Sequence, residues 1–257
     1  MIVEIKKELL LPFLLYNTPI KYNEHITLHP VTMNDVIVFQ TLIRSFTVRK
    51  DSTFNDKKII KMTYLEFLLY CLGNEELEHQ YNIHGLSSYF IYAIQLLQLC
   101  CKGSEVKVDK TSGQIAINDY IVTPQVFDDL RRIILIQNDV EFDIDEFLNY
   151  DTEMKLRQAQ EISKKDIEKG DIEDYIDSLI IAMNTTEERV MNMTIRKFWR
   201  YIRRYQLCEN YKILKTGECS GMVTFKNPIK YWMVSLDVDD KYAHLKTDED
   251  ELRSKIG

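Results

Sequence analysis

Apolar residues recur at helical spacing through much of the N-terminal half and predict a series of amphipathic helices. Thr32 and Asp35 frame a capping-box pattern that predicts a helix running to about Lys50. The apolar positions that follow are spaced by three and four residues: Val36, Phe39, Leu42, Ile43 and Phe46. One face of this helix is therefore expected to lie in a hydrophobic core.

The capping pattern recurs at Thr63 and Glu66, before a helix that is expected to run to Leu72 and to end at Gly73. A further helix is predicted from Ser87, with apolar residues around most of its circumference. Such a helix is buried on nearly all sides or lies at the centre of an assembly.

A period of two replaces the helical period between residues 105 and 122 and predicts a short hairpin with its turn at 109–113. A smaller pair of strands is expected near 18–22 and 25–29. Thr123 and Pro124 then supply an N-cap and a first helical residue, which predicts a helix to about Gln137.

Together these patterns predict an α+β fold that is mainly α with small β hairpins. We expect a mainly helical domain with small β elements at 1–150 and an acidic helical linker region at 151–190. A smaller mixed α/β module that is basic and aromatic, with an acidic tail, is expected at 191–257.

The amino-acid composition favours some classes of protein and disfavours others. The chain has 257 residues with 45% hydrophobic and 28% charged residues, which is typical of a soluble globular protein. Only 8 Gly and 5 Pro occur, so Gly-dependent Rossmann domains, sandwiches and barrels are disfavoured. Five Cys without a CxxC pair, and no apolar leader or membrane span, indicate an intracellular protein with reduced thiols.

The net charge of −7 conceals a strong local polarity. Residues 139–190 contain 16 acidic and 6 basic side chains, a net charge of −10. Residues 194–230 contain 9 basic and 2 acidic side chains, a net charge of +7. This division indicates contacts between chains or between domains more than it indicates catalysis.

The stretch 194–208 carries the strongest local feature, a helix with an aromatic face opposite a basic face. Five cations beside aromatic rings could bind phosphates and stack on bases, as in a nucleic-acid-binding protein. Alternatively the helix packs through its aromatic face, and its cations face the acidic stretch upstream. We prefer the second interpretation because the surplus of acids lies nearby.

No catalytic, cofactor or metal site is predicted. The alternating acids of 139–146 lack the Gly and the final Glu of a calcium loop, so we interpret them as a solvent face with Phe142 and Ile144 turned inward. A metal-dependent hydrolase built on these acids is the weakest of the alternatives. No phosphate-loop motif occurs, and the five His show no pairing that favours zinc or nucleophilic chemistry.

The run from Met193 to Met233 resembles a C-terminal module of tail-region proteins of large phages that infect Gram-positive bacteria. Its elements are the basic-aromatic helix, a strand and turn in YKILKTGE, then SGMVTF, and a closing PIKYW. The segments TPIKYNEHITLHPVTMNDVIVFQ and IIKMTYLEFLLY are similar to the same class of proteins, in which a small strand pair precedes a bundle of helices.

The resemblance implies a non-enzymatic tail or baseplate protein, either an assembly chaperone for tape-measure or hub components or a virion subunit. It implies other tail or baseplate proteins as partners, in the host cytoplasm during assembly or in the virion tail. A homo-oligomer is left open, as is nucleic acid, and no membrane or cofactor is expected. The residues proposed for contacts are Arg196, Lys197, Arg200, Arg203, Arg204, Tyr201, Tyr205, Tyr231 and Trp232.

Overall fold

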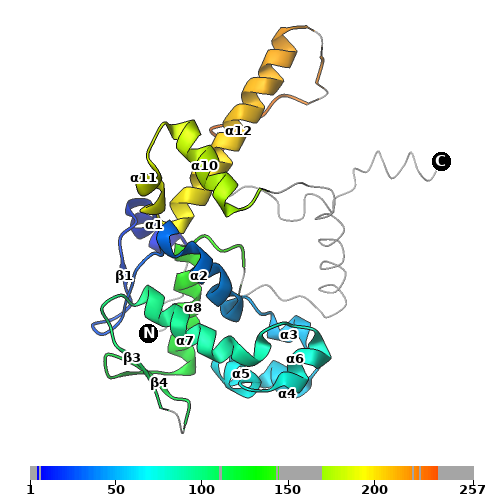
Figure 1. Cartoon of the computed structure of the whole chain (residues 1–257). Coiled ribbons are helices and arrows are strands. Elements are labelled where there is room, and N and C mark those ends of the chain that lie inside the picture. The colour runs from blue at the N-terminus through cyan, green and yellow to red at the C-terminus, as the bar shows by residue number, and fades with distance from the viewer. Residues whose placement is uncertain are drawn as a thin grey trace, which may run out of the picture. The chain divides into compact units, whose positions relative to one another are not determined.

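The computed structural model describes residues 5, 7–109, 112–142, 144, 170–221, 223–225 and 227–236 (Figure 1). It is mainly helical and has two small antiparallel sheets, which confirms the predicted fold class. The chain divides into two compact units, residues 1–198 and 199–257, which are described separately. Residues 151–169 of the proposed linker at 151–190 lie outside the described residues, and that domain division stays a prediction.

The helical segments of the first unit are short and follow one another closely. Among the described residues they are, in chain order, α1 (Lys7–Tyr16), the 3-10 turn η1 (Met33–Asp35), α2 (Val36–Leu42), η2 (Ile43–Phe46), α3 (Lys50–Thr53), α4 (Lys57–Lys61), α5 (Tyr64–Cys71), α6 (Glu75–Tyr81), η3 (Leu86–Ser88), α7 (Tyr89–Cys100), α8 (Pro124–Gln137), α10 (Ile172–Met183) and α11 (Glu187–Met191).

Helix α7 forms the centre of the first unit, as its apolar circumference predicts. It packs against α2, η2, α5 and β3, and seven of its residues are buried. Helix α8 lies against α5, and the Phe127 ring of α8 meets the ring of Phe46 edge-on at 5.5 Å. Cys100 and Cys101, at the end of α7, are buried in this core, where burial raises the pKa of the Cys101 thiol to about 12.

The two predicted capping boxes differ in the structure. Around Thr63 the box is complete: the Thr63 hydroxyl accepts from the Glu66 N–H, and the Glu66 carboxylate accepts from the Thr63 N–H. At Thr32 the prediction was wrong, because its side chain makes no cap bond. Instead Thr32 forms an isolated β-bridge with Thr194, and the helix ends at Phe46 rather than near Lys50.

Both predicted strand pairs are present. Strands β1 (Ile20–Lys21) and β2 (Thr27–Leu28) pair antiparallel. The predicted hairpin is a three-stranded meander, since β3 (Val106–Val108) and β4 (Ile115–Ile117) are joined by β5 (Tyr120–Val122) on the far side of β4. Thr123 then caps α8 by accepting from the Val126 N–H, with Pro124 as the first helical residue, as expected.

Helix α12 (Ile195–Cys219) starts in the first unit and continues into the second. The strand and turn expected at 211–218 were wrong, because these residues continue the helix. Ion pairs at helical spacing stabilise this part, Glu209 with Lys212 at 2.7 Å and Lys215 with Glu218 at 2.6 Å. Residues 223–225 have no regular secondary structure.

Candidate functional site

The start of α12 is held by main-chain and side-chain contacts within the first unit. The Ile195 N–H donates to the Val31 carbonyl at 2.9 Å, and the Met33 N–H donates to the Met193 carbonyl at 2.9 Å. The Arg196 guanidinium donates through Nη1 to the Leu14 carbonyl at 3.1 Å and is only 6% exposed. Arg196 was proposed as a contact residue, but in this structure it secures the helix to α1.

The middle of α12 carries most of the other proposed contact residues. Ile202 is buried, whereas Tyr201 and Tyr205 are each 40% exposed. The cations on this part of the helix are half-buried: Lys197, Arg200, Arg203 and Arg204. The amphipathic helix predicted from the aromatic and basic spacing is therefore present.

In the second unit, a return segment at 227–236 lies against α12. Arg204 donates through Nη1 to the carbonyl of Trp232 and to that of Val234, the latter at 2.9 Å. The Tyr231 ring meets the ring of Tyr211 edge-on at 5.5 Å. Arg204, Tyr231 and Trp232, three of the residues proposed for contacts, thus lie close to one another, and Tyr211 joins them. Tyr211 was missed because a strand was expected at its position.

An apolar surface on α1 was not predicted at all. Leu10 and Leu14 of this helix are buried, but its other large apolar side chains face solvent. Four of these are more than half exposed: Leu9, Leu11, Leu15 and Tyr16. The sequence shows this run of leucines plainly, but only the structure shows that it is not in the core.

A cavity of about 400 Å³ opens in the first unit between α3, the start of α5 and α8, with Phe142 and Ile144 on one wall. The guanidinium of Arg131, on α8, lies 3.5 Å above the Tyr64 ring and donates through Nε to the Phe46 carbonyl at 2.8 Å. Arg131 is only 4% exposed. Phe142 and Ile144, which were expected to turn inward, both line this cavity and are half-buried.

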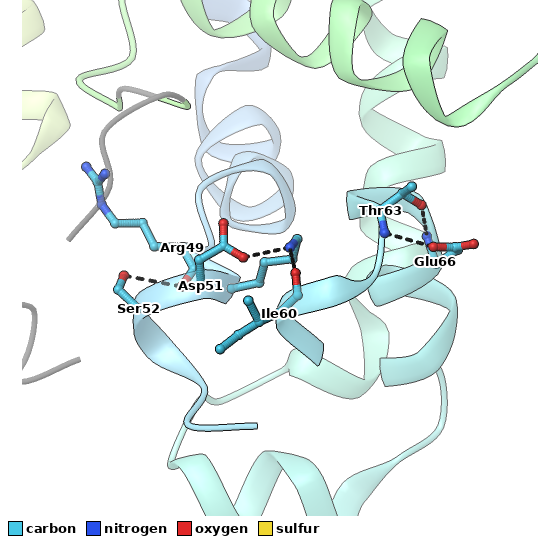
Figure 2. A network of polar contacts seen from close by, with 7 residues as sticks. Arg49, Asp51, Ser52, Ile60, Thr63 and Glu66 are labelled. Carbon is cyan, nitrogen blue, oxygen red and sulfur yellow. Dashed lines mark hydrogen bonds and ion pairs between the residues drawn. The ribbon is translucent and has the colours of Figure 1, made fainter. Parts of the chain in front are cut away.

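Other charged groups line the same cavity. Lys50 donates to the Asp51 carboxylate at 2.7 Å and to the Ile60 carbonyl at 2.6 Å, and Figure 2 shows these two acceptor residues, Asp51 and Ile60. Arg49 lies 4.7 Å from the centre of the Phe142 ring. Burial raises the pKa of Asp128 despite the cations around it, while the same burial lowers the pKa of Arg131.

The structure describes only some of the acids proposed for a metal-dependent hydrolase, the weakest of the alternatives. Asp143, Asp145 and Glu146 lie outside the described residues. Within the described ranges, no group of three or more His, Cys, Asp or Glu side chains is placed to hold a metal ion. Likewise, none of the described helices has the length and apolar character needed to cross a bilayer.

These features define a mainly helical protein of two units whose long α12 is secured at its start by the first unit. Residues 162–237 match the sequence model of the family described as the YomV second domain, a phage-derived protein family. The match indicates a phage-associated protein, and it includes the run from Met193 to Met233 that carries the resemblance described above. No curated protein and no solved structure matches the chain.

Proposed function

We propose that this protein is a non-enzymatic tail or baseplate assembly or structural protein that acts through protein–protein contacts. The match of residues 162–237 to a phage-derived family supports the phage setting. The assignment to the tail or baseplate rests on the resemblance of the run from Met193 to Met233.

The observation that carries the proposal is the apolar surface of α1. Ordinary soluble proteins scatter single apolar side chains over their surfaces, whereas a helix that exposes most of its apolar residues is typical of a contact site. Leu11 and Leu15 lie four positions apart on one side of α1, and Leu9 and Phe13 do so on another. A partner that covered these side chains would remove their apolar surface from water, and this burial would stabilise the complex.

Charge supplies the second support. Residues 139–190 carry a net charge of −10 and residues 194–230 a net charge of +7. Complementary charges of this kind steer association and select partners more than they add affinity. We therefore expect complexes with tail or baseplate components that form more slowly as salt is raised.

Nucleic-acid binding through 194–208 stays a second, untested prediction. Two of its five cations donate to protein carbonyls, Arg196 to Leu14 and Arg204 to Trp232 and Val234. These bonds leave fewer cations on that helix for phosphates, which is why protein contacts are preferred here.

The test is complex formation with the purified tail and baseplate proteins encoded beside this chain, followed by size-exclusion chromatography and light scattering. Leu11→Glu combined with Leu15→Glu is expected to lower affinity at least about tenfold, because each buried leucine contributes about 1.5–3 kcal/mol. Ile121→Glu on β5 is the matched control, since Ile121 is also half-exposed and lies on a different element.

Absence of any complex, or equal weakening by the α1 variant and the Ile121 control, would contradict the proposal. Self-association of the chain that the α1 variant abolishes would make a second copy the partner. Mass spectrometry of purified virions then separates a virion subunit from an assembly chaperone that leaves before completion.

A further inference from the structure

Helix α1 exposes apolar side chains over a wide arc of its circumference. Successive residues of an α-helix are about 100° apart, so the buried Leu10 and Leu14 mark the side of α1 that packs on the first unit. The exposed residues from position 9 onward cover an arc of roughly 200° on the other sides. They are Leu9, Leu11, Pro12, Phe13, Leu15 and Tyr16. A partner has to curve around α1 to cover all of them.

The large side chains of this arc fall into two stripes on different flanks of α1. The Leu9 stripe consists of Leu9, Phe13 and Tyr16, which are spaced by four and three positions. The Leu11 stripe consists of Leu11 and Leu15, which are four positions apart. Each stripe alone has the spacing with which an amphipathic helix packs on a flat partner. Helix α1 exposes both.

A second copy of the chain that paired through its own α1 would cover only one stripe. A helix of 10 residues is about 15 Å long and about 11 Å across, so its side has an area of roughly 500 Å². Side-by-side packing covers an arc of about 100°, or roughly 150 Å² on each copy. Specific interfaces bury about 1,200–2,000 Å² in total, so pairing through α1 alone falls well short.

A groove differs from a second α1 in what its walls can reach. Walls that follow the whole arc cover both stripes and extend down to the surface of the first unit on either side of the helix. The contact area then includes both flanks of α1 and the rims of the groove. A concave partner therefore fits α1 better than a flat one.

A lipid surface also fits α1 less well than an apolar groove does. Helices that lie in the surface of a bilayer carry Lys or Arg on their polar face, where these charges meet the lipid headgroups. Helix α1 carries one basic and one acidic residue, Lys7 and Glu8, and no charge from Leu9 to Tyr16. This uncharged surface matches an uncharged, apolar wall of a protein.

We propose that α1 inserts as a helix into an apolar groove of a tail or baseplate protein, which covers the Leu9 stripe and the Leu11 stripe together. An amphipathic helix laid into a hydrophobic groove is a recurrent mode of recognition, with anchors at these spacings. The Arg196 bond to the Leu14 carbonyl holds α1 on the first unit, so the helix is ordered before the partner binds. The inference rests on the proposed function, since it gives the shape of the partner at the same α1 surface.

The test is calorimetric titration of the full chain with the purified tail or baseplate proteins encoded beside it. Leu9→Ala with Phe13→Ala truncates one stripe, and Leu11→Ala with Leu15→Ala truncates the other. Each pair is expected to weaken binding at least about tenfold, because the partner buries both stripes. Alanine favours the helix and adds no charge, so only side chains that the partner covers should change the affinity.

The matched control is Ile121→Ala with Ile181→Ala, since both isoleucines are more than half exposed and lie on other elements, β5 and α10. This pair is expected to leave the affinity close to that of the parent chain. Circular dichroism checks that each variant is folded. Light scattering of each variant without a partner measures whether the α1 substitutions change the mass of the chain in solution.

A complex that only one alanine pair weakens would overturn the groove and leave the proposed function standing, because a flat partner covers one stripe. A complex that neither pair weakens would also overturn the groove. Absence of any complex would overturn the proposed function and this inference with it. A dimer of the chain alone that either α1 pair dissociates would overturn the inference in favour of a second copy. Binding to vesicles of phosphatidylcholine and phosphatidylglycerol that either pair abolishes would overturn it in favour of a lipid surface.

Discussion

Tyr64 joins three parts of the first unit, and removing its hydroxyl provides the sharpest test of how the cavity wall is held. The hydroxyl donates to the Ser45 carbonyl at 2.7 Å and accepts from the Val48 N–H at 3.3 Å. The ring lies below the Arg131 guanidinium and is almost completely buried. Tyr64→Phe therefore removes two hydrogen bonds while it preserves the ring and its contact with Arg131.

The expected loss of stability follows from the groups left behind. The Ser45 carbonyl loses its side-chain partner in a buried site, and the Val48 N–H loses its partner in a part-buried one. Leaving a buried polar group unsatisfied costs about 1–3 kcal/mol. The loss of both hydrogen bonds in Tyr64→Phe is therefore expected to lower the free energy of unfolding by about 2–4 kcal/mol. Urea denaturation at pH 7 measures this, with an unchanged dependence on denaturant.

The pH dependence of the free energy of unfolding provides a second test of Tyr64→Phe. Burial raises the pKa of Tyr64 to about 12, above its ordinary value of 10. The stabilisation from the neutral hydroxyl is thus fully present below pH 10 and is lost as pH rises from 10 to 12. Phenylalanine does not ionise, so the stability difference between the two proteins should shrink by about 2–3 kcal/mol over that interval.

Tyr201→Phe is the control, because Tyr201 lies on α12 and is partly exposed. It is expected to change the free energy of unfolding by less than about 0.5 kcal/mol. If Tyr64→Phe cost no more than this control at pH 7, the hydroxyl would not hold η2 to α5 and the reasoning would be refuted.

Two further predictions concern turns of the first unit. Glu78 accepts from the N–H groups of Gly85 and Ser87 and from the Ser87 hydroxyl, and these bonds lower its pKa to about 2. Glu78→Gln is expected to cost about 1–3 kcal/mol at pH 7, and the difference should diminish as pH falls from 4.5 towards 2, measured by urea denaturation across pH. A constant difference would refute the role of the charge. Gly113 has φ +69°, and a Cβ there would lie 2.5 Å from Cδ2 of Leu69, so Gly113→Ala is expected to lower stability by about 1–2 kcal/mol. Gly217→Ala on α12 has open space and is expected to raise stability by up to about 1 kcal/mol, and equal signs for the two alanines in thermal denaturation would contradict the argument.

The two capping patterns show where local sequence suffices and where it does not. At Thr63 the partner is Glu66, whose side chain is long enough to reach back to the Thr63 N–H. At Thr32 the corresponding residue is the shorter Asp35, and residues 193–195 bind the same segment through main-chain contacts. These contacts come from a distant part of the chain, so no local pattern around Thr32 could have predicted them.

The helix through 211–218 could have been predicted from the sequence. The resemblance implied a strand and turn in YKILKTGE, but Glu209 and Lys215 each have an opposite charge three positions further along, at Lys212 and Glu218. Such spacing brings side chains together on a helix and not on a strand. The charge pattern was therefore a better guide to this segment than the resemblance.

The cavity could not be predicted in the same way. Arg131 lies on α8, which the sequence predicts as a helix, and a basic side chain in such a helix is ordinarily expected to face solvent. Its burial depends on Tyr64, Phe46 and Phe142, which reach it from three other segments. Only the folded arrangement shows that this arginine lines a cavity.

The bond from Arg196 to the Leu14 carbonyl spans 182 positions of the chain. The segment that matches a known family starts at residue 162, yet its longest helix is secured by α1 and by residues 31–33, far outside that segment. The matched segment therefore cannot be exchanged independently of the residues that secure its helix. If recombination exchanged residues 162–237 for those of a relative, the new helix would have to meet Leu14, Val31 and Met33 correctly. Among relatives, we therefore expect substitutions at the start of α12 to be accompanied by substitutions at Leu14, Val31 and Met33.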